Sequence, residues 1–322
     1  MDSTDVEVLG DALAWLEDGQ RVALVTVVET WGSSPRPVGS LLAVREDGRF
    51  SGSVSGGCIE GDLVDRLDRD FPAKPYLTAY GVTADEARHF GLPCGGNLRL
   101  VVEPVRDTAG IAQTVAEIRE RRRVIRTLDL DSGETSVVPA KNSDRFAFDG
   151  KRVSNVHGPR WRLILVGAGQ LTRYLAQMAQ MLDFSVFVTD PREEYREQWD
   201  LPGASLLDGM PDDAIRELGT DAYTAILTTA HEPKVDDMAL LEALKSDAFY
   251  IGALGSSRTN ASRRVRLAMF DLTAEQIARL HGPAGIPLGS HTPAEIALSM
   301  LAEVVAVRNG AELPAKRTSA TV

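Results

Sequence analysis

The chain has 322 residues, of which 43% are hydrophobic and 25% are charged, and it carries a formal net charge of −11 at pH 7. This length predicts two domains, the acidic charge argues against binding to nucleic acid or to an anionic membrane, and the apolar runs are too short for a transmembrane helix. With only two cysteines and an acidic start unlike a signal peptide, we expect a cytoplasmic protein without a disulfide framework.

The start of the chain predicts a helix, a buried strand and a hairpin around one stiff loop. Apolar residues recur at helical spacing over residues 5–17, and the valine-rich residues 21–28 are typical of a strand. Two prolines and two glycines in residues 29–40 exclude a regular element there, so this loop presents Arg36 at its apex. A second strand then leads into a hairpin at residues 47–48.

Both cysteines lie in glycine-rich turns, Ser55-Gly56-Gly57-Cys58 and Pro93-Cys94-Gly95-Gly96. Glycine brings backbone N–H groups close to neighbouring atoms and permits a positive φ. The apolar spacing after Cys58 predicts a helix that opens at this residue, where the helix dipole favours a thiolate. Each cysteine alone could equally fill a small gap in the core. The two turns together favour a functional role.

The rest of the first half predicts a strand over residues 98–103, a helix over residues 111–122, and then short strands and turns. Its composition changes near residues 157–159, where a histidine, a glycine and a proline follow one another. We therefore expect a mixed α/β domain over residues 1–155 and a second domain over residues 156–322.

The second half opens with the pattern of a nucleotide-binding βαβ unit. A buried strand over residues 161–166 is followed by a turn with Gly167 and Gly169, a helix, and a strand that ends in Asp190. This acid lies about 20 residues after the turn, as in the dinucleotide fingerprint. In that fingerprint the helix N-terminus binds phosphate and the acid binds a ribose hydroxyl.

Two residues complicate this interpretation. Thr172 stands where the fingerprint has its third glycine, so we expect weaker packing between helix and strand. Arg192 leaves the choice between NAD and NADP open. Further alternation of strands and helices predicts a Rossmann-like domain with a parallel sheet, which ends in a capped helix over residues 293–308.

Other familiar sites are missing from the sequence. The five histidines show none of the spacings of a structural zinc site. There is also no nucleophile elbow and no phosphate-binding lysine loop. The chemistry that remains consists of thiols, glycine-rich turns and a nucleotide-type fold, which do not by themselves name a reaction.

The motifs taken together resemble the xanthine dehydrogenase accessory protein family, XdhC/CoxI, over nearly the whole chain. In the first half they are Glu29-Thr30-Trp31-Gly32-Ser33-Ser34-Pro35-Arg36-Pro37-Val38-Gly39, Ser55-Gly56-Gly57-Cys58-Ile59-Glu60 and Pro93-Cys94-Gly95-Gly96. In the second half they are Val166-Gly167-Ala168-Gly169, Asp190-Pro191-Arg192, Tyr250-Ile251-Gly252 with Gly255-Ser256, and Thr292-Pro293 with Glu295-Ile296-Ala297.

The resemblance implies a protein that binds the molybdenum cofactor (molybdopterin), assists its sulfuration and inserts it into xanthine dehydrogenase or a related molybdenum hydroxylase. The implied partners are that apoenzyme and a cysteine desulfurase, and a homodimer is the implied assembly. The chain would be a cofactor chaperone rather than an enzyme in its own right.

On this hypothesis the two cysteine turns and Arg36 form the cofactor site. Backbone N–H groups of Gly56, Gly57, Gly95 and Gly96 would bind anionic oxygens, Arg36 would pair with the phosphate, and Glu60 belongs to the same motif. Cys58 or Cys94 would ligate molybdenum or carry sulfur. The alternative is an NAD(P)-dependent oxidoreductase that uses Gly167, Gly169 and Asp190.

Overall fold

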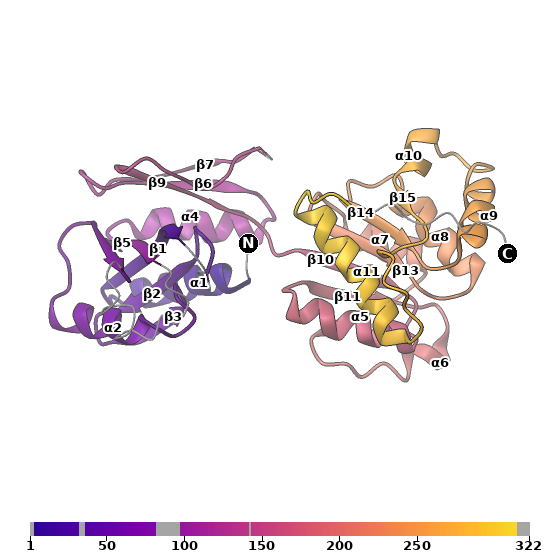
Figure 1. Cartoon of the computed structure of the whole chain (residues 1–322), viewed down its shortest axis with the longest axis horizontal. Helices are drawn as coiled ribbons and strands as arrows, with labels where there is room; N and C mark the ends of the chain where they lie inside the picture. Colours follow the sequence, from indigo (N-terminus) through magenta and orange to yellow (C-terminus); the bar gives the residue numbers. More distant parts are fainter. Residues whose placement is uncertain (1–2, 32–35, 82–96, 142, 314–322) are drawn as a thin grey trace. The chain divides into compact units, whose positions relative to one another are not determined.

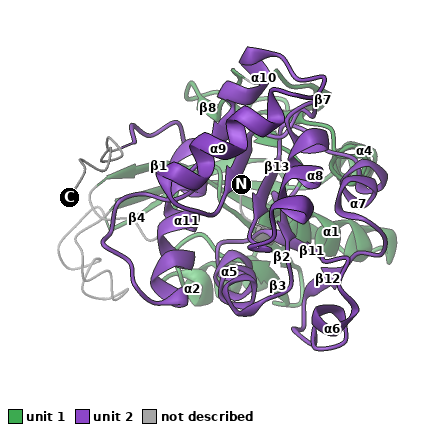
Figure 2. Ribbon diagram, turned by 90° about the vertical axis from the view of Figure 1, so that its right-hand side faces the viewer, with its two compact units in different colours: residues 1–159 green, residues 160–322 purple. Residues whose placement is uncertain are grey.

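The computed structural model describes residues 3–31, 36–81, 97–141 and 143–313. The chain divides into two compact units, residues 1–159 and 160–322, shown in green and purple in Figure 2. The boundary expected after residue 155 falls inside strand β9 (Arg152–His157), which pairs with its neighbour through His157. The units therefore separate after Pro159, where this strand has ended.

Unit 1 is built on a five-stranded antiparallel sheet with the strand order β3-β2-β1-β5-β4. The strands expected over residues 21–28, 41–44 and 98–103 are present, and the predicted hairpin joins the second and third strands. The edge strand β4 was not anticipated because its side chains are mostly half-exposed and form no apolar run. The bounds are β1 (Val22–Trp31), β2 (Leu41–Arg45), β3 (Phe50–Gly52), β4 (Tyr76–Tyr80) and β5 (Asn97–Pro104).

Helices cover both faces of this sheet (Figure 1). On one face α2 (Glu60–Arg69) buries Leu63 and Leu67 against the inward side chains of β1, β2 and β5. On the other face α1 (Ser3–Glu17) and α4 (Thr108–Arg119) pack side by side over the sheet. The helix that follows Cys58 is therefore fixed to the sheet along its whole apolar side.

A second, four-stranded antiparallel sheet packs on the face that carries α4. Val28 and Val101 of the first sheet contact Leu128 and Val153 of the second. The strand order is β7-β6-β9-β8, with β6 (Val124–Asp129), β7 (Thr135–Pro139) and β8 (Ala147–Phe148).

One ion pair crosses between the two sheets of unit 1. Arg126 on β6 donates two hydrogen bonds to Glu103 on β5, at 2.8 and 2.5 Å, and both side chains are 5% exposed. A buried pair of this kind adds little net stability, but each partner is needed to neutralise the other. The pair therefore fixes which faces of the two sheets meet.

Unit 2 is a six-stranded parallel sheet with the strand order β12-β11-β10-β13-β14-β15. The order of the strands in the sequence reverses between β10 and β13, which is where such folds place ligands. The Rossmann-like parallel sheet expected from the sequence is thus confirmed. The strands are β10 (Arg162–Val166), β11 (Ser185–Thr189), β12 (Ala204–Leu206), β13 (Thr224–Thr228), β14 (Tyr250–Ala253) and β15 (Leu280–His281).

Helices flank both faces of this sheet (Figure 1). The two helices that cover one face, α5 and α11, pack against each other, and α7 and α8 do the same on the other face. The helices are α5 (Gln170–Met181), α6 (Glu193–Arg196), α7 (Pro211–Leu218), α8 (Pro233–Ala243), α9 (Ser257–Leu267), α10 (Ala274–Ala278) and α11 (Pro293–Arg308). Of the helices in the described residues, none combines the length and hydropathy of a membrane span.

The Glu103–Arg126 pair gives a first prediction. Glu103→Gln should destabilise the full chain by about 3–5 kcal/mol, because it leaves the buried Arg126 guanidinium without a counter-charge. The double variant Glu103→Leu/Arg126→Met should lie much closer to wild type. Urea unfolding followed by circular dichroism measures both, with the exposed Glu46→Gln as the control. A Glu103→Gln variant as stable as this control would contradict the prediction.

Candidate functional site

The Cys58 turn lies between the end of β3 and the start of α2. Cys58 is exposed, as are Gly56 and Gly57 before it, whereas Ile59 and Glu60 after it are buried. The helix begins at Glu60, two residues later than Cys58 itself. The cysteine therefore stands on the loop that enters the helix, with its side chain toward solvent.

The carboxylate of Glu60 organises this turn. One of its oxygens accepts hydrogen bonds from the Ser53 hydroxyl at 2.7 Å and from the backbone N–H groups of Val54 and Ser55 at 3.0 and 2.9 Å. The other accepts from the Ser55 hydroxyl and from the N–H groups of Gly57 and Ile59, at 3.0 and 3.2 Å for the two amides. Six donors thus surround one carboxylate.

The two serines connect the remaining amides. The Ser55 hydroxyl oxygen accepts from the N–H groups of Cys58 and Ile59 at 2.9 and 3.0 Å, and the Ser53 hydroxyl oxygen accepts from Gly56 at 2.8 Å. Every backbone N–H from Val54 to Ile59 therefore has a partner inside the turn. Neither serine was among the predicted site residues, although hydroxyl residues two positions apart before Gly-Gly are a usable signal.

This arrangement differs from the expectation that Gly56 and Gly57 present their amides to a ligand. Both glycines have positive φ, 75° and 106°, as expected for a backbone that curls its N–H groups around an anion. The anion that these groups surround is the chain's own Glu60. The physical reason is proximity, because an internal carboxylate three residues away needs no binding from solution.

The same contacts set the ionisation of Glu60. Burial would raise the pKa of this carboxyl, but hydrogen bonds from Ser55, Ser53 and the backbone outweigh it and lower the pKa to about 2. Glu60 is therefore ionised throughout the physiological range. Its negative charge lies within the turn that presents Cys58, so this turn does not attract a phosphate.

The other predicted residues of this half are placed only in part. Arg36 is half-buried, and its loop is anchored where the Asn155 side chain donates to the Gly39 carbonyl at 2.9 Å. The Cys94, Gly95 and Gly96 turn lies outside the described residues. Within the described part of the chain, no cluster of three or more histidine, cysteine or acidic side chains could hold a metal ion.

In unit 2 the glycine turn has the geometry that the fingerprint requires. Gly167 has φ of +104°, and a Cβ there would lie 2.7 Å from backbone atoms of Ala230 at the end of β13. Gly169 is the N-cap of α5 and has open space around its Cα. Only Gly167 is thus required to be glycine for packing.

Asp190 has a different role from the one predicted. Its carboxylate accepts from the Ala168 N–H at 2.8 Å and from Arg192 through the backbone N–H, Nε and Nη2, at 3.0, 2.9 and 2.7 Å. Burial raises its pKa, but these bonds dominate and lower it. Both oxygens are occupied, so a ribose could bind Asp190 only after displacing Arg192.

Thr172 does not weaken the packing of α5, contrary to expectation. Its hydroxyl is fully buried and lies 2.9 Å from the hydroxyl of Thr229, which also bonds to the Val166 carbonyl at 3.0 Å. A chain of hydrogen bonds replaces the close contact that glycine would provide.

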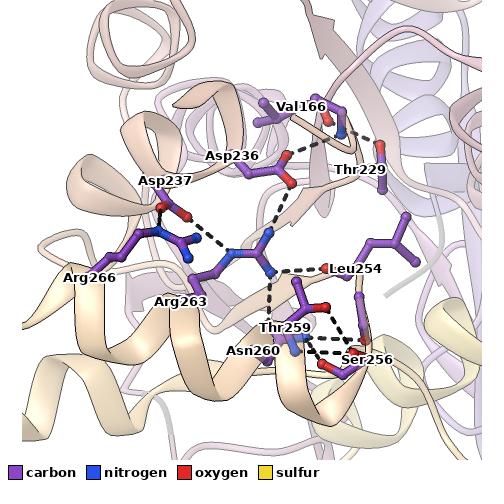
Figure 3. Close-up of polar contacts among 12 residues, drawn as sticks. Val166, Thr229, Asp236, Asp237, Leu254, Ser256, Thr259, Asn260, Arg263 and Arg266 are labelled. Atoms are coloured by element: carbon purple, nitrogen blue, oxygen red, sulfur yellow. Dashed lines mark hydrogen bonds and ion pairs between the residues drawn. The ribbon is translucent and has the colours of Figure 1, made fainter. Parts of the chain in front are cut away.

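A buried ionic network holds the loop between β14 and α9 (Figure 3). Arg263 bonds to Asp236 and Asp237 of α8 at 3.0 and 3.2 Å, to the Leu254 carbonyl at 3.0 Å and to the Asn260 side chain at 2.8 Å. Burial raises the pKa of Asp236 to about 6, although Arg263 opposes this. All these groups satisfy one another, so the network is structural.

Comparison with known proteins decides the family. Residues 163–304 match the XdhC Rossmann domain, and residues 15–70 match the XdhC and CoxI family. The chain belongs to the XdhC and CoxI family. The second match includes the Arg36 loop and the Cys58 turn. The resemblance drawn from the motifs is thereby confirmed.

Two curated relatives of this family extend over most of the chain. The Escherichia coli (strain K12) protein named molybdenum cofactor insertion chaperone PaoD is 27% identical, over 94% of this chain and 88% of its own length. A Bacillus subtilis (strain 168) protein, whose name makes it a probable component of xanthine dehydrogenase, is 28% identical, over 92% and 96%. A crystal structure from Bacillus halodurans, described as a xanthine dehydrogenase, has a TM-score of 0.74 at 23% identity over 98% of each chain, which shows the same fold.

The Glu60 centre gives a second prediction. Because the folded pKa of about 2 lies below the unfolded value of about 4.3, Glu60 stabilises the protein fully above pH 4.3, and this contribution disappears as the pH falls toward 2. Glu60→Gln should cost roughly 2–4 kcal/mol at pH 7, and much less at pH 3. Urea unfolding at both pH values tests this. The exposed Glu7→Gln should show no such difference, and an equal effect of both changes would contradict it.

Gly167 and Gly169 form a matched pair for a third prediction. Gly167→Ala should destabilise the protein by about 2–4 kcal/mol, because the new Cβ collides with the Ala230 backbone at a strained φ. Gly169→Ala should cost less than about 1 kcal/mol, the loss expected at an N-cap. Thermal unfolding of both variants distinguishes them, and equal losses would show that close packing does not require glycine at residue 167.

Proposed function

We propose that this chain is a molybdenum-cofactor chaperone, which binds the cofactor as cargo, assists its sulfuration and inserts it into a molybdenum hydroxylase of the xanthine dehydrogenase type. The names of its relatives support this proposal. The observation that carries it is the exposed Cys58 thiol on a turn fixed by Glu60. A rigid turn presents its thiol without the entropy cost of ordering a loop.

The turn fits the metal end of such a cargo better than its phosphate. A thiolate is a soft ligand and a nucleophile, so Cys58 suits molybdenum or a transferable sulfur atom. The amides of the turn are used internally, and Glu60 is negative, so a phosphate would have to be held elsewhere. Gly56 and Gly57 then act by shaping the turn and leaving room above it, since a Cβ at Gly57 would meet no described atom within 4 Å.

The remaining predicted residues enter the proposal as stated from the family resemblance. Arg36 is the candidate for the phosphate, and Cys94 with Gly95 and Gly96 is the candidate second thiol turn. The apoenzyme and a cysteine desulfurase are the proposed partners, and a homodimer is the proposed assembly. The NAD(P)-dependent oxidoreductase is the less favoured alternative, because Arg192 occupies the Asp190 carboxylate.

Binding of anaerobically prepared molybdenum cofactor is the fourth prediction. Wild type should bind at micromolar or lower Kd, and Cys58→Ala should weaken binding by at least about tenfold, the effect of losing one strong ligand. Cys94→Ala tests the second thiol in the same assay. Exposed Ser132→Ala, on a distant turn of unit 1, is the control.

Two results would count against the proposal. One is a Cys58→Ala variant that binds the cofactor and activates the target apoenzyme as wild type does, which removes Cys58 from the site. The other is a wild type that binds no cofactor but shows a clear thermal shift with NAD or NADP, which favours the oxidoreductase.

A further inference from the structure

A pocket of about 450 Å³ lies at the C-terminal end of α2, opposite to the end that carries the Cys58 turn. Its volume is in the range of sites for small molecules. It is lined by two cations, an anion, a proline and an aromatic ring: Arg66, Arg69, Asp70, Pro72 and Tyr76. None of these residues was among the sites predicted from the sequence.

The two arginines are held in different ways. Arg66 bonds through Nε to Asp62 at 2.7 Å and lies over the ring of Tyr80, at 5.2 Å from its centroid. Arg69 uses only Nε, which donates to the Asp65 carbonyl at 2.9 Å. Within the described residues, no hydrogen bond or ion pair engages the two terminal amino groups of Arg69. Arg69 therefore has a fixed stem and a fork available for an anion.

Tyr76 and Asp70 complete the pocket from the neighbouring chain. Tyr76 is on the edge strand β4 and is 37% exposed, and Asp70 is the exposed C-cap of α2. Burial raises the pKa of Tyr76, with Arg66 lowering it and Asp70 raising it, so these three side chains lie within electrostatic range of one another. The ring is thus half-covered and carries charges of both signs beside it.

Each group matches one part of a particular ligand class. A guanidinium fork binds phosphate, and an exposed aromatic ring stacks on a planar heterocycle. A carboxylate accepts two parallel hydrogen bonds from adjacent N–H donors, which is what the 2-amino-4-oxo edge of pterins and guanine presents. An isolated phosphate would not need the carboxylate, and an unphosphorylated ring would not need Arg69.

We propose that this pocket binds a phosphorylated 2-amino-4-oxo heterocycle, with Arg69 on the phosphate, Asp70 on the amino-oxo edge and Tyr76 against the ring. The assignment to the pterin end of the cargo rests on the proposed function. It also supplies what the Cys58 turn lacks, a place for the phosphate.

The position of the pocket on α2 supports the assignment. The ten residues of the helix span about 15 Å, and side chains lean toward the helix N-terminus, so Arg66 and Arg69 point back toward the Cys58 end. The C-terminal end of a helix is electronegative, so a phosphate is held there only by guanidinium charge. Binding should therefore depend strongly on Arg69.

Fluorescence titration with neopterin monophosphate tests the proposal on the full chain, with guanosine 5′-monophosphate and ribose 5-phosphate as comparison ligands. Arg69→Gln and Tyr76→Ala should each raise the Kd of neopterin monophosphate by about tenfold or more, and Asp70→Asn should do the same without affecting ribose 5-phosphate. Cys58→Ala should bind this metal-free ligand as wild type does.

Matched controls come from the same unit. Arg119→Gln removes an exposed arginine from the last turn of α4, as Arg69→Gln does from α2. Phe50→Ala removes an exposed ring from β3, the opposite edge of the sheet from Tyr76. Both controls should bind like wild type.

The outcomes separate the pocket from the chaperone proposal. Tighter binding of guanosine monophosphate than of neopterin monophosphate, with the same variant effects, supports the ligand class and assigns a nucleotide as its source. The inference is overturned if wild type binds neither heterocycle, if ribose 5-phosphate binds equally well, or if the pocket variants bind like the controls. Loss of Cys58-dependent binding of the metal-loaded cofactor would instead contradict the chaperone proposal alone.

Discussion

The structure of the Cys58 turn depends on one carboxylate that is bound by its own backbone. Glu60 receives six hydrogen bonds from a segment of seven residues, so the turn and the start of α2 form a single unit. Without this anion, the converging N–H groups would lack partners in a partly buried place, which is costly. The exposed thiol is thus the outer surface of a structure that is determined from inside.

Unit 2 repeats the same device with different residues. Asp190 binds the Ala168 amide beside the glycine turn, Asp236 binds the Ala230 amide at 3.1 Å after β13, and Glu303 binds the Gly285 amide near the sheet edge. All three side chains are buried. A chain with a net charge of −11 therefore uses part of its acidity to fix loops, in places where a binding protein would hold an anionic ligand.

Much of the fold could be predicted because the apolar periodicity is strong. The helix with its capping box at Thr292 and the buried strands of both units follow from local patterns. The edge strand β4 and the exact end of unit 1 could not, because each is defined by pairing with a distant segment. Periodicity reports burial along the chain, and it does not report which strand lies next to which.

The candidate site was predictable only to the level of residue types. Cys58 and its glycines were recognised, but the sequence does not tell whether an acid such as Glu60 or Asp190 faces a ligand or its own backbone. The Thr172–Thr229 contact shows the same limit. Since each hydroxyl is buried and bonded to the other, replacing either threonine alone would leave its partner without that bond. These two positions, far apart in sequence, should therefore covary among relatives, and a glycine at the first should accompany a non-hydroxyl residue at the second.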